Sequence, residues 1–246
     1  MGYTAHLELT AAACYTESCA IFTAKTSNDD FSMLGAVSPF RLTDDMDPEP
    51  STSYSIEAVS SISGHTDRCW SLDWHPNQPI LASCSGDKSV RLTKYQALSA
   101  KFPASSSELT KSHSRTVRSL SWSPRGKMLA TASFDSTVGI WCRVTEDGIE
   151  DGDDSSQESD GDEGEWECVS TLEGHESEVK SVVWSHDGTL LATCGRDKSV
   201  WIWEVTPGGE DFECMAVLMD HAQDVKQVAW HPTEEVSQIC VCLFAI

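Results

Sequence analysis

Short stretches in which apolar and polar residues alternate recur along this chain. The segments 179–184 (VKSVVW), 190–195 (LLATCG) and 199–203 (SVWIW) alternate with a period of two and are rich in β-branched residues and tryptophan, which is typical of half-buried strands. Asp-Gly and Asp-Lys-Ser sequences between them indicate tight turns. A fourth such segment, 212–218 (FECMAVL), follows. Each unit therefore predicts four antiparallel strands, the content of one propeller blade.

The units also share a histidine, a tryptophan and an aspartate at fixed distances from one another. A histidine precedes a tryptophan by nine residues in four units, and an aspartate by 22 residues in three of them. Successive histidines are 48, 62 and 46 residues apart, slightly more than the usual length of a four-stranded blade. The positions are His65, Trp74 and Asp87; His113, Trp122 and Asp135; His175, Trp184 and Asp197; and His221 and Trp230. The spacing predicts an all-β fold, an incomplete β-propeller of about three and a half blades, with units starting near residues 64, 112, 174 and 220.

The repeats occupy residues 55–235, and three segments differ from them. Residues 1–54, rich in Ala, Ser and Thr and then acidic, predict a loose N-terminal tail. Residues 146–165 carry eleven acids and no base, half of the net charge of −22, which predicts a solvated, disordered loop, with a binding role as the alternative. The divergent C-terminal tail, 236–246, is apolar and predicts one added strand. We expect the resulting open arc of blades to aggregate when expressed alone.

A second set of residues shares the repeat spacing and predicts a buried polar network in each blade. It contains the histidine, a Ser or Thr four residues before the aspartate, the aspartate, and the residue six after it, which is Thr93 in the first unit. Buried polar groups need partners, and these four side chains satisfy one another. A Ser-His-Asp catalytic triad is the alternative, but three copies at a repeat period indicate a framework. The sets are His65, Ser83, Asp87 and Thr93; His113, Thr131, Asp135 and Trp141; and His175, Thr193, Asp197 and Trp203.

The ten cysteines include no C-x-x-C motif, and Cys84 and Cys194 occupy a slot that holds Ala132 in the second unit. Such a slot predicts a small buried core position and no metal site. We also find no nucleophile elbow, phosphate loop or other cofactor motif. We therefore expect no enzyme and no cofactor. A signal peptide and a membrane-spanning stretch are not apparent, which predicts a cytoplasmic or nuclear protein with reduced thiols and no membrane partner.

Candidate binding residues follow from the propeller geometry, because propellers bind through the loops and strand ends on their faces. The slots three and five residues after each histidine, and the one before each aspartate, are expected there. Basic and aromatic residues in these slots suit a carboxylate-bearing peptide, with Arg196 the foremost candidate; a mixed solvated surface is the alternative. Nucleic acid is not expected, since a chain of charge −22 repels phosphates. The residues are Arg68, Trp70, Arg118, Phe134, Lys180, Arg196 and Lys226.

The three units resemble WD40 repeats. The segments TLEGHESEVKSVVWSHDGTLLATCGRDKSVWIWE, SFDSTVGIW and LMDHAQDVKQVAWHP further resemble the WD40 subunit of the cytosolic iron–sulfur protein assembly (CIA) machinery, the propeller of its targeting complex. The resemblance, which covers about residues 55–235, implies a seven-bladed WD40 β-propeller of which this chain is a truncated form. It implies a scaffold that binds partner CIA subunits and client apoproteins and holds no cluster itself. The alternative is a generic WD40 scaffold in chromatin or ubiquitin-ligase assembly.

Overall fold

The computed structural model describes residues 10–15, 18–26, 54–95, 106–109, 113–145, 148–149, 165–206, 211–231 and 239–242. Within these ranges all regular secondary structure is β-strand. They contain no helix with the length and apolar character that crossing a membrane requires. The all-β fold class predicted from the alternating pattern is confirmed.

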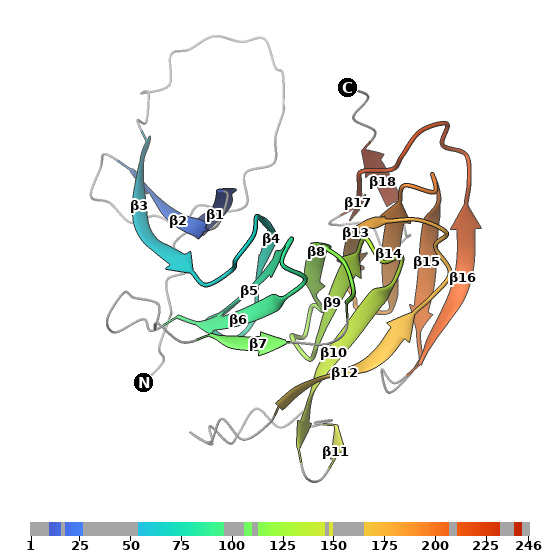
Figure 1. The fold of residues 1–246 in the computed structure, drawn as a ribbon, viewed down its shortest axis with the longest axis horizontal. Coiled ribbons are helices and arrows are strands. Elements are labelled where there is room, and N and C mark those ends of the chain that lie inside the picture. The colour runs from blue at the N-terminus through green and yellow to red at the C-terminus, as the bar shows by residue number, and fades with distance from the viewer. Residues whose placement is uncertain are drawn as a thin grey trace, which may run out of the picture.

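Three antiparallel sheets follow one another in the order of the repeats (Figure 1). Their strands are ordered in space as in the sequence, from an innermost first strand to an outermost fourth. Blade 1 comprises β4 (Cys69–Trp74), β5 (Ile80–Ser85), β6 (Val90–Lys94) and β7 (Ser107–Leu109). Blade 2 comprises β8 (Val117–Trp122), β9 (Met128–Ser133), β10 (Val138–Thr145) and β12 (Glu165–Leu172). Blade 3 comprises β13 (Val179–Trp184), β14 (Leu190–Gly195), β15 (Val200–Val205) and β16 (Phe212–Leu218). The four-stranded blades are as predicted.

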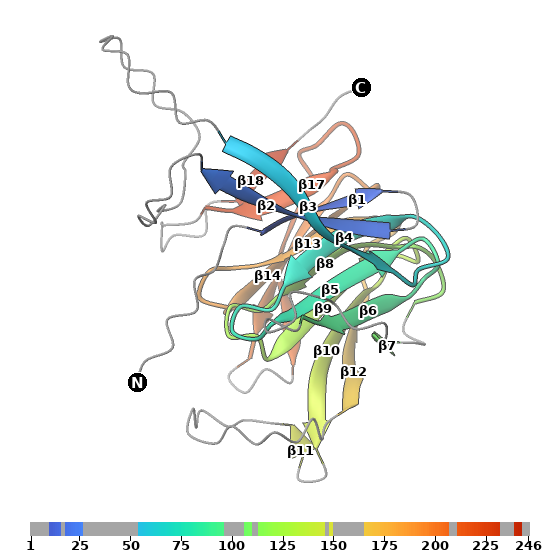
Figure 2. The same cartoon turned by 90° about the vertical axis from the view of Figure 1, so that its left-hand side faces the viewer.

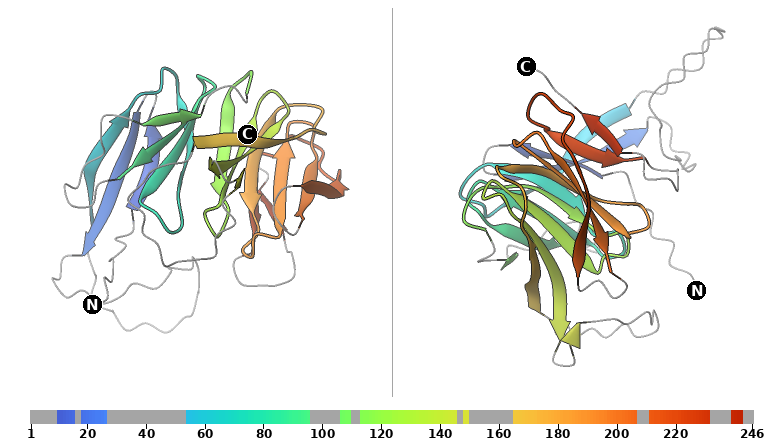
Figure 3. Two further views of the ribbon diagram at one scale, coloured as in Figure 1. Left: turned by 90° about the horizontal axis from the view of Figure 1, so that it is seen from below. Right: turned by 90° about the vertical axis from the view of Figure 1, so that its right-hand side faces the viewer.

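The innermost strands of successive blades lie side by side, and the blades fan out from them (Figure 3). Strand β17 (Gln227–Trp230), which opens the fourth unit, continues this row beside β13. It pairs antiparallel with β18 (Ile239–Cys242). The expectation that the divergent C-terminal segment adds one strand is confirmed by this pairing.

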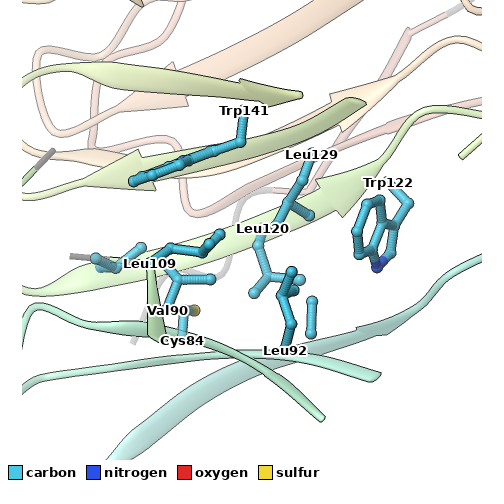
Figure 4. Packing of buried hydrophobic residues seen from close by; sticks show 10 residues of the cluster. Cys84, Val90, Leu92, Leu109, Leu120, Trp122, Leu129 and Trp141 are labelled. Atoms are coloured by element: carbon cyan, nitrogen blue, oxygen red, sulfur yellow. The ribbon is translucent and has the colours of Figure 1, made fainter. Parts of the chain in front are cut away.

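Apolar side chains from neighbouring blades meet in continuous cores. In the core between blades 1 and 2, Val90 and Leu92 of blade 1 lie against Leu120, Trp122 and Leu129 of blade 2 (Figure 4). Equivalent clusters join blade 2 to blade 3 and blade 3 to β17. Since burying apolar area is the main favourable term in folding, each blade is stabilised mainly by its neighbours.

In blade 2, blade 3 and the fourth unit, the tryptophan nine residues after the histidine links its unit to the preceding blade. Its indole N–H donates to a backbone carbonyl on the innermost strand of the preceding blade, which satisfies the one polar atom of a large apolar side chain. The bonds run from Trp122 to Asp73 (3.3 Å), from Trp184 to Ser121 (3.1 Å) and from Trp230 to Val183 (3.0 Å). The fixed spacing therefore reflects contact between blades as well as order within each blade.

The N-terminal segment differs from the loose tail expected from its composition. It contains β1 (Thr10–Tyr15) and β2 (Ser18–Thr26), which form a three-stranded antiparallel sheet with β3 (Tyr54–Ser63) (Figure 2). These strands lack the histidine–tryptophan–aspartate spacing, so the repeat pattern does not reveal them. Residues 27–53 lie outside the described residues.

The acidic insertion joins β10 to β12 within blade 2. At its start, β11 (Gly148–Ile149) pairs with Val144 and Thr145 of β10. The remainder of the predicted disordered loop, up to residue 164, lies outside the described residues. The long strands β10 and β12 pair along their length, and the insertion connects the end of β10 to the start of β12, where β11 also lies (Figure 2).

Candidate functional site

The polar network of blade 3 has the composition that the spacing predicts. The His175 ring lies 2.7 Å from Asp197 through Nδ1 and 2.9 Å from the Thr193 hydroxyl through Nε2. The carboxylate only accepts, so Nδ1–H donates to Asp197 and Nε2 accepts from Thr193. Burial lowers the pKa of His175, with Asp197 opposing the shift, which suits this neutral ring. The indole N–H of Trp203 donates to Thr193 Oγ1 at 3.0 Å, so the structure brings all four residues together.

Blade 2 repeats this arrangement and blade 1 has a shorter version. His113 lies 3.3 Å from Asp135 and 2.9 Å from Thr131, to which Trp141 donates at 3.0 Å. In blade 1, His65 Nδ1 and Nε2 lie 3.0 Å from Asp87 and 2.9 Å from Ser83. The fourth position there is Thr93, which is buried and has no ring N–H.

The threonine hydroxyls of the blade 2 and blade 3 networks are not placed to act as nucleophiles. Thr131 and Thr193 are fully buried, and each accepts an indole N–H in addition to its bond with the histidine ring. A catalytic hydroxyl must reach a substrate, and these lie in the core. The geometry supports the framework interpretation and not the triad.

A fifth network member follows each aspartate by two residues, and the sequence reasoning missed it. The side chains of Ser89, Thr137 and Ser199 donate to the aspartate Oδ1 at 2.7, 2.7 and 2.6 Å. Burial acts to raise the pKa of Asp87, but hydrogen bonds from Ser89 and from the Thr66 backbone lower it to about 2. The recurring Ser or Thr in the Asp-Lys-Ser and Asp-Ser-Thr turns is the signal that could have identified this member.

The predicted binding residues gather at one end of the innermost strands. Trp70, Arg118 and Lys180 occupy the second position of β4, β8 and β13, and Lys226 directly precedes β17. The residue before each network aspartate lies beside this row, because its backbone N–H donates to the carbonyl of the residue three positions after the histidine. Phe134 donates to Thr116 and Arg196 donates to Glu178, each at 2.9 Å. We call the predicted binding residues together the basic rim; they are Arg68, Trp70, Arg118, Phe134, Lys180, Arg196 and Lys226.

The blade 1–2 part of the rim is centred on a tryptophan. The guanidinium carbons of Arg68 and Arg118 lie 5.0 and 4.6 Å from the Trp70 ring centroid, within the range of cation–π attraction. Among the described residues, no carboxylate lies within ion-pair distance of either guanidinium. Two guanidinium groups thus flank one indole and make no ion pair with any described residue, an arrangement that favours an anionic ligand.

The blade 2–3 part of the rim carries its own acids. Glu178 lies 3.2 Å from Arg196 and 3.2 Å from Arg115, a residue that the sequence reasoning did not select. Hydrogen bonds from Ser177, the Glu178 backbone N–H and the two arginines lower the pKa of Glu178 to about 2. Arg196, the foremost candidate from sequence, is therefore already paired.

The remaining rim residues are also engaged. Asp224 binds Lys180 and Lys226, and the Lys180 bond is the first cause of its lowered pKa. The Phe134 ring lies 6.0 Å from the Arg115 guanidinium. Sequence slots therefore place these residues on one rim but do not reveal which of them carry an uncompensated charge.

The described residues contain no cluster of His, Cys, Asp and Glu side chains that could hold a metal ion. Cys84 and Cys194 are fully buried, as predicted for a small core slot. Burial raises the pKa of the Cys194 thiol to about 12, so this cysteine stays protonated and unreactive.

Comparison with known proteins adds a family and a set of relatives. The repeat family described as "WD domain, G-beta repeat" matches residues 56–93, 105–142 and 166–204. The chain is 52% identical over 175 residues to "Probable cytosolic iron-sulfur protein assembly protein 1" of Mycosarcoma maydis, which covers 62% of this chain and 38% of that protein. Proteins of the same name from Kluyveromyces lactis and Malassezia globosa are 44% and 59% identical over 155 and 96 residues, covering 63% and 39% of this chain and 42% and 25% of their own lengths. The chain thus spans about two fifths or less of these relatives.

Proposed function

Because this chain is a WD40-repeat protein, we propose that it is a non-catalytic scaffold that helps to assemble iron–sulfur proteins in the cytosol. Its relatives are named for cytosolic iron–sulfur protein assembly and share 44–59% of their aligned residues with it. In this role it holds other assembly factors and the apoproteins that receive clusters, in the cytoplasm and in the nucleus. The work consists of binding, and no step of cluster chemistry takes place on the chain.

The uncompensated Trp70 part of the rim is the observation that carries this proposal. A partner segment with a carboxylate and an adjacent apolar side chain fits it, since guanidinium groups grip carboxylates and the indole buries apolar surface. Arg68 and Arg118 supply the positive charge, while Trp70 fixes their separation. The other rim residues flank this contact.

Co-purification tests the proposal. The tagged chain is isolated from cells in wild-type form and as Arg68→Glu with Arg118→Glu, and the bound proteins are identified. We expect iron–sulfur assembly factors with the wild type and their loss with the double variant. Lys127→Glu is the matched control, because Lys127 is an exposed base in the β8–β9 turn, at the far end of blade 2 from the rim. It should retain the partners.

Cell physiology gives the second readout. Depletion of the protein should lower the activity of a cytosolic iron–sulfur enzyme. Normal enzyme activity after depletion, together with recovery of chromatin or ubiquitin-ligase factors, would instead favour a generic WD40 scaffold.

A further inference from the structure

The outermost strand of blade 3 exposes more large apolar side chains than its counterpart in blade 2, where Val169, 37% exposed at the position equivalent to Met215, is the one such residue among those described. Met215 is 58% exposed, Leu218 43% and Met219 71%, and Val217 is also exposed. Among the described residues, these four make up all but one of the exposed large apolar side chains. We call these four side chains, three near the end of β16 and Met219 just after it, the apolar strip. Val217 and Leu218 point to opposite faces of the sheet, because side chains alternate along a strand.

Strand β12 shows that a blade of this protein does not require such a strip. The segments WECVSTLE (166–173) and FECMAVLM (212–219) align without gaps, and each has an irregularity in its pairing at the same place. Where β12 has Thr171 and then Glu173, β16 has Val217 and then Met219. Charged and polar residues normally protect sheet edges from pairing, so blade 3 lacks a protection that blade 2 has.

An uncompensated negative charge lies at the other end of the same strand. Glu213 is the direct cross-strand partner of Glu204, and both are exposed. Like charges directly opposite on a sheet destabilise it. No lysine or arginine of the described residues lies within ion-pair distance of either carboxylate.

We propose that β16 is a docking edge for an extended segment of a partner protein, apolar along its length and basic at one end. The outer edge of β16 is the free side of the blade 3 sheet, where an added strand gains main-chain hydrogen bonds and covers the strip. From Glu213 to Leu218 is roughly 16 Å of strand, so a lysine or arginine about five residues from the apolar end meets Glu213 and Glu204. Charge complementarity thus selects the occupant. This surface is separate from the basic rim and does not depend on the function proposed for it.

A peptide pair tests the edge directly. The probes are labelled nine-residue peptides of alternating valine and threonine, one ending in two lysines and the other in two glutamates, titrated into the full chain by fluorescence anisotropy. We expect the lysine peptide to bind at least about fivefold more tightly, because the two glutamates attract one and repel the other. Glu213→Lys should reverse the preference, whereas Glu167→Lys, at the equivalent position of β12, should leave it unchanged.

Exchanging the two edges provides a second comparison. Val217→Thr with Met219→Glu gives β16 the residues of β12 and should abolish peptide binding, while Thr171→Val with Glu173→Met should create a site on blade 2. Trp70→Ala should leave peptide binding intact, which separates this edge from the rim. Equal affinity for both peptides, or no response to Glu213→Lys, would overturn the proposal. A dimer in sedimentation that Met219→Glu dissolves would identify a second copy as the occupant, and would also overturn it.

Discussion

The two parts of the basic rim use the same slots of the repeat but differ in charge balance. Between blades 1 and 2, the guanidinium groups of Arg68 and Arg118 lie against Trp70, and neither makes an ion pair among the described residues. Between blades 2 and 3, Glu178 holds Arg196 and Arg115. Equivalent positions in a repeat are thus equivalent in place but not in chemistry, because the neighbouring blade decides whether a base is neutralised. Only the first part has arginines that make no ion pair among the described residues.

We expect the largest effect on stability from substitutions in the polar network of blade 3, which lies next to the blade 2–3 part of the rim. Asp197→Ala leaves His175 and Ser199 without their acceptor, and an unsatisfied buried partner costs about 1–3 kcal/mol. We expect a lower melting temperature by circular dichroism. An unchanged temperature would show that the network does not support blade 3, and Arg196→Glu, on the exposed neighbour, is the control that should melt normally.

Trp70→Ala should weaken partner binding by about tenfold or more, because buried tryptophans at interfaces are frequent hot spots. Phe134→Ala removes a ring from the compensated part and should have a smaller effect. Binding is measured by titrating the purified partner into each variant. If the Phe134 variant lost more affinity, the uncompensated part would not be the main contact.

Asp73, on β4 of blade 1, adds a pH dependence that the innermost strands of blades 2 and 3 lack, because Ser121 and Val183 occupy the corresponding positions there. Asp73 accepts a hydrogen bond from the Trp122 N–H at 2.8 Å, and burial raises its pKa from 3.8 to about 6. Between pH 3.8 and about 6, the Asp73 carboxyl is therefore protonated in the folded state and ionised in the unfolded state. The contribution of Asp73 to the free energy of unfolding falls as the pH rises through this range. Asp73→Asn should raise the melting temperature by about 2–4 °C at pH 8 and change it little at pH 5. An equal effect at both pH values would rule out titration of Asp73.

Removing the Glu178 ion pairs from the blade 2–3 part of the rim should make that part resemble the blade 1–2 part. Glu178→Gln removes the negative charge that pairs with Arg115 and Arg196, and we expect the affinity for an acidic partner to rise about threefold, the scale of an exposed ion pair. Binding at low salt should show the largest gain, because salt screens exposed charges. A loss of affinity would mean that Glu178 itself contacts the partner.

The repeat spacing was sufficient to predict the blades and the residues of each polar network, since these depend on short, regular distances along the chain. It could not predict the pairing of Arg115 with Glu178, which are 63 residues apart on different blades. Arg196 was singled out because its slot differs between units, yet the same loop places it beside Glu178. Strands β1 and β2 were missed because they lack the repeat residues, and the apolar strip on β16 becomes visible only when exposure is known.

Two matched charge reversals test the central difference most directly. Arg118→Glu and Arg196→Glu both reverse one arginine on the rim. Arg196 is exposed, where substitutions usually alter stability by about 0.5 kcal/mol or less, and Arg118 is half-buried, so the melting temperature of each variant is measured beside its affinity. Titration of the co-purified partner by isothermal calorimetry should show a large loss of affinity for Arg118→Glu and a clearly smaller loss for Arg196→Glu, because Glu178 already neutralises Arg196. Equal losses, or a larger loss for Arg196→Glu, would contradict the division of the rim into a charged and a compensated part.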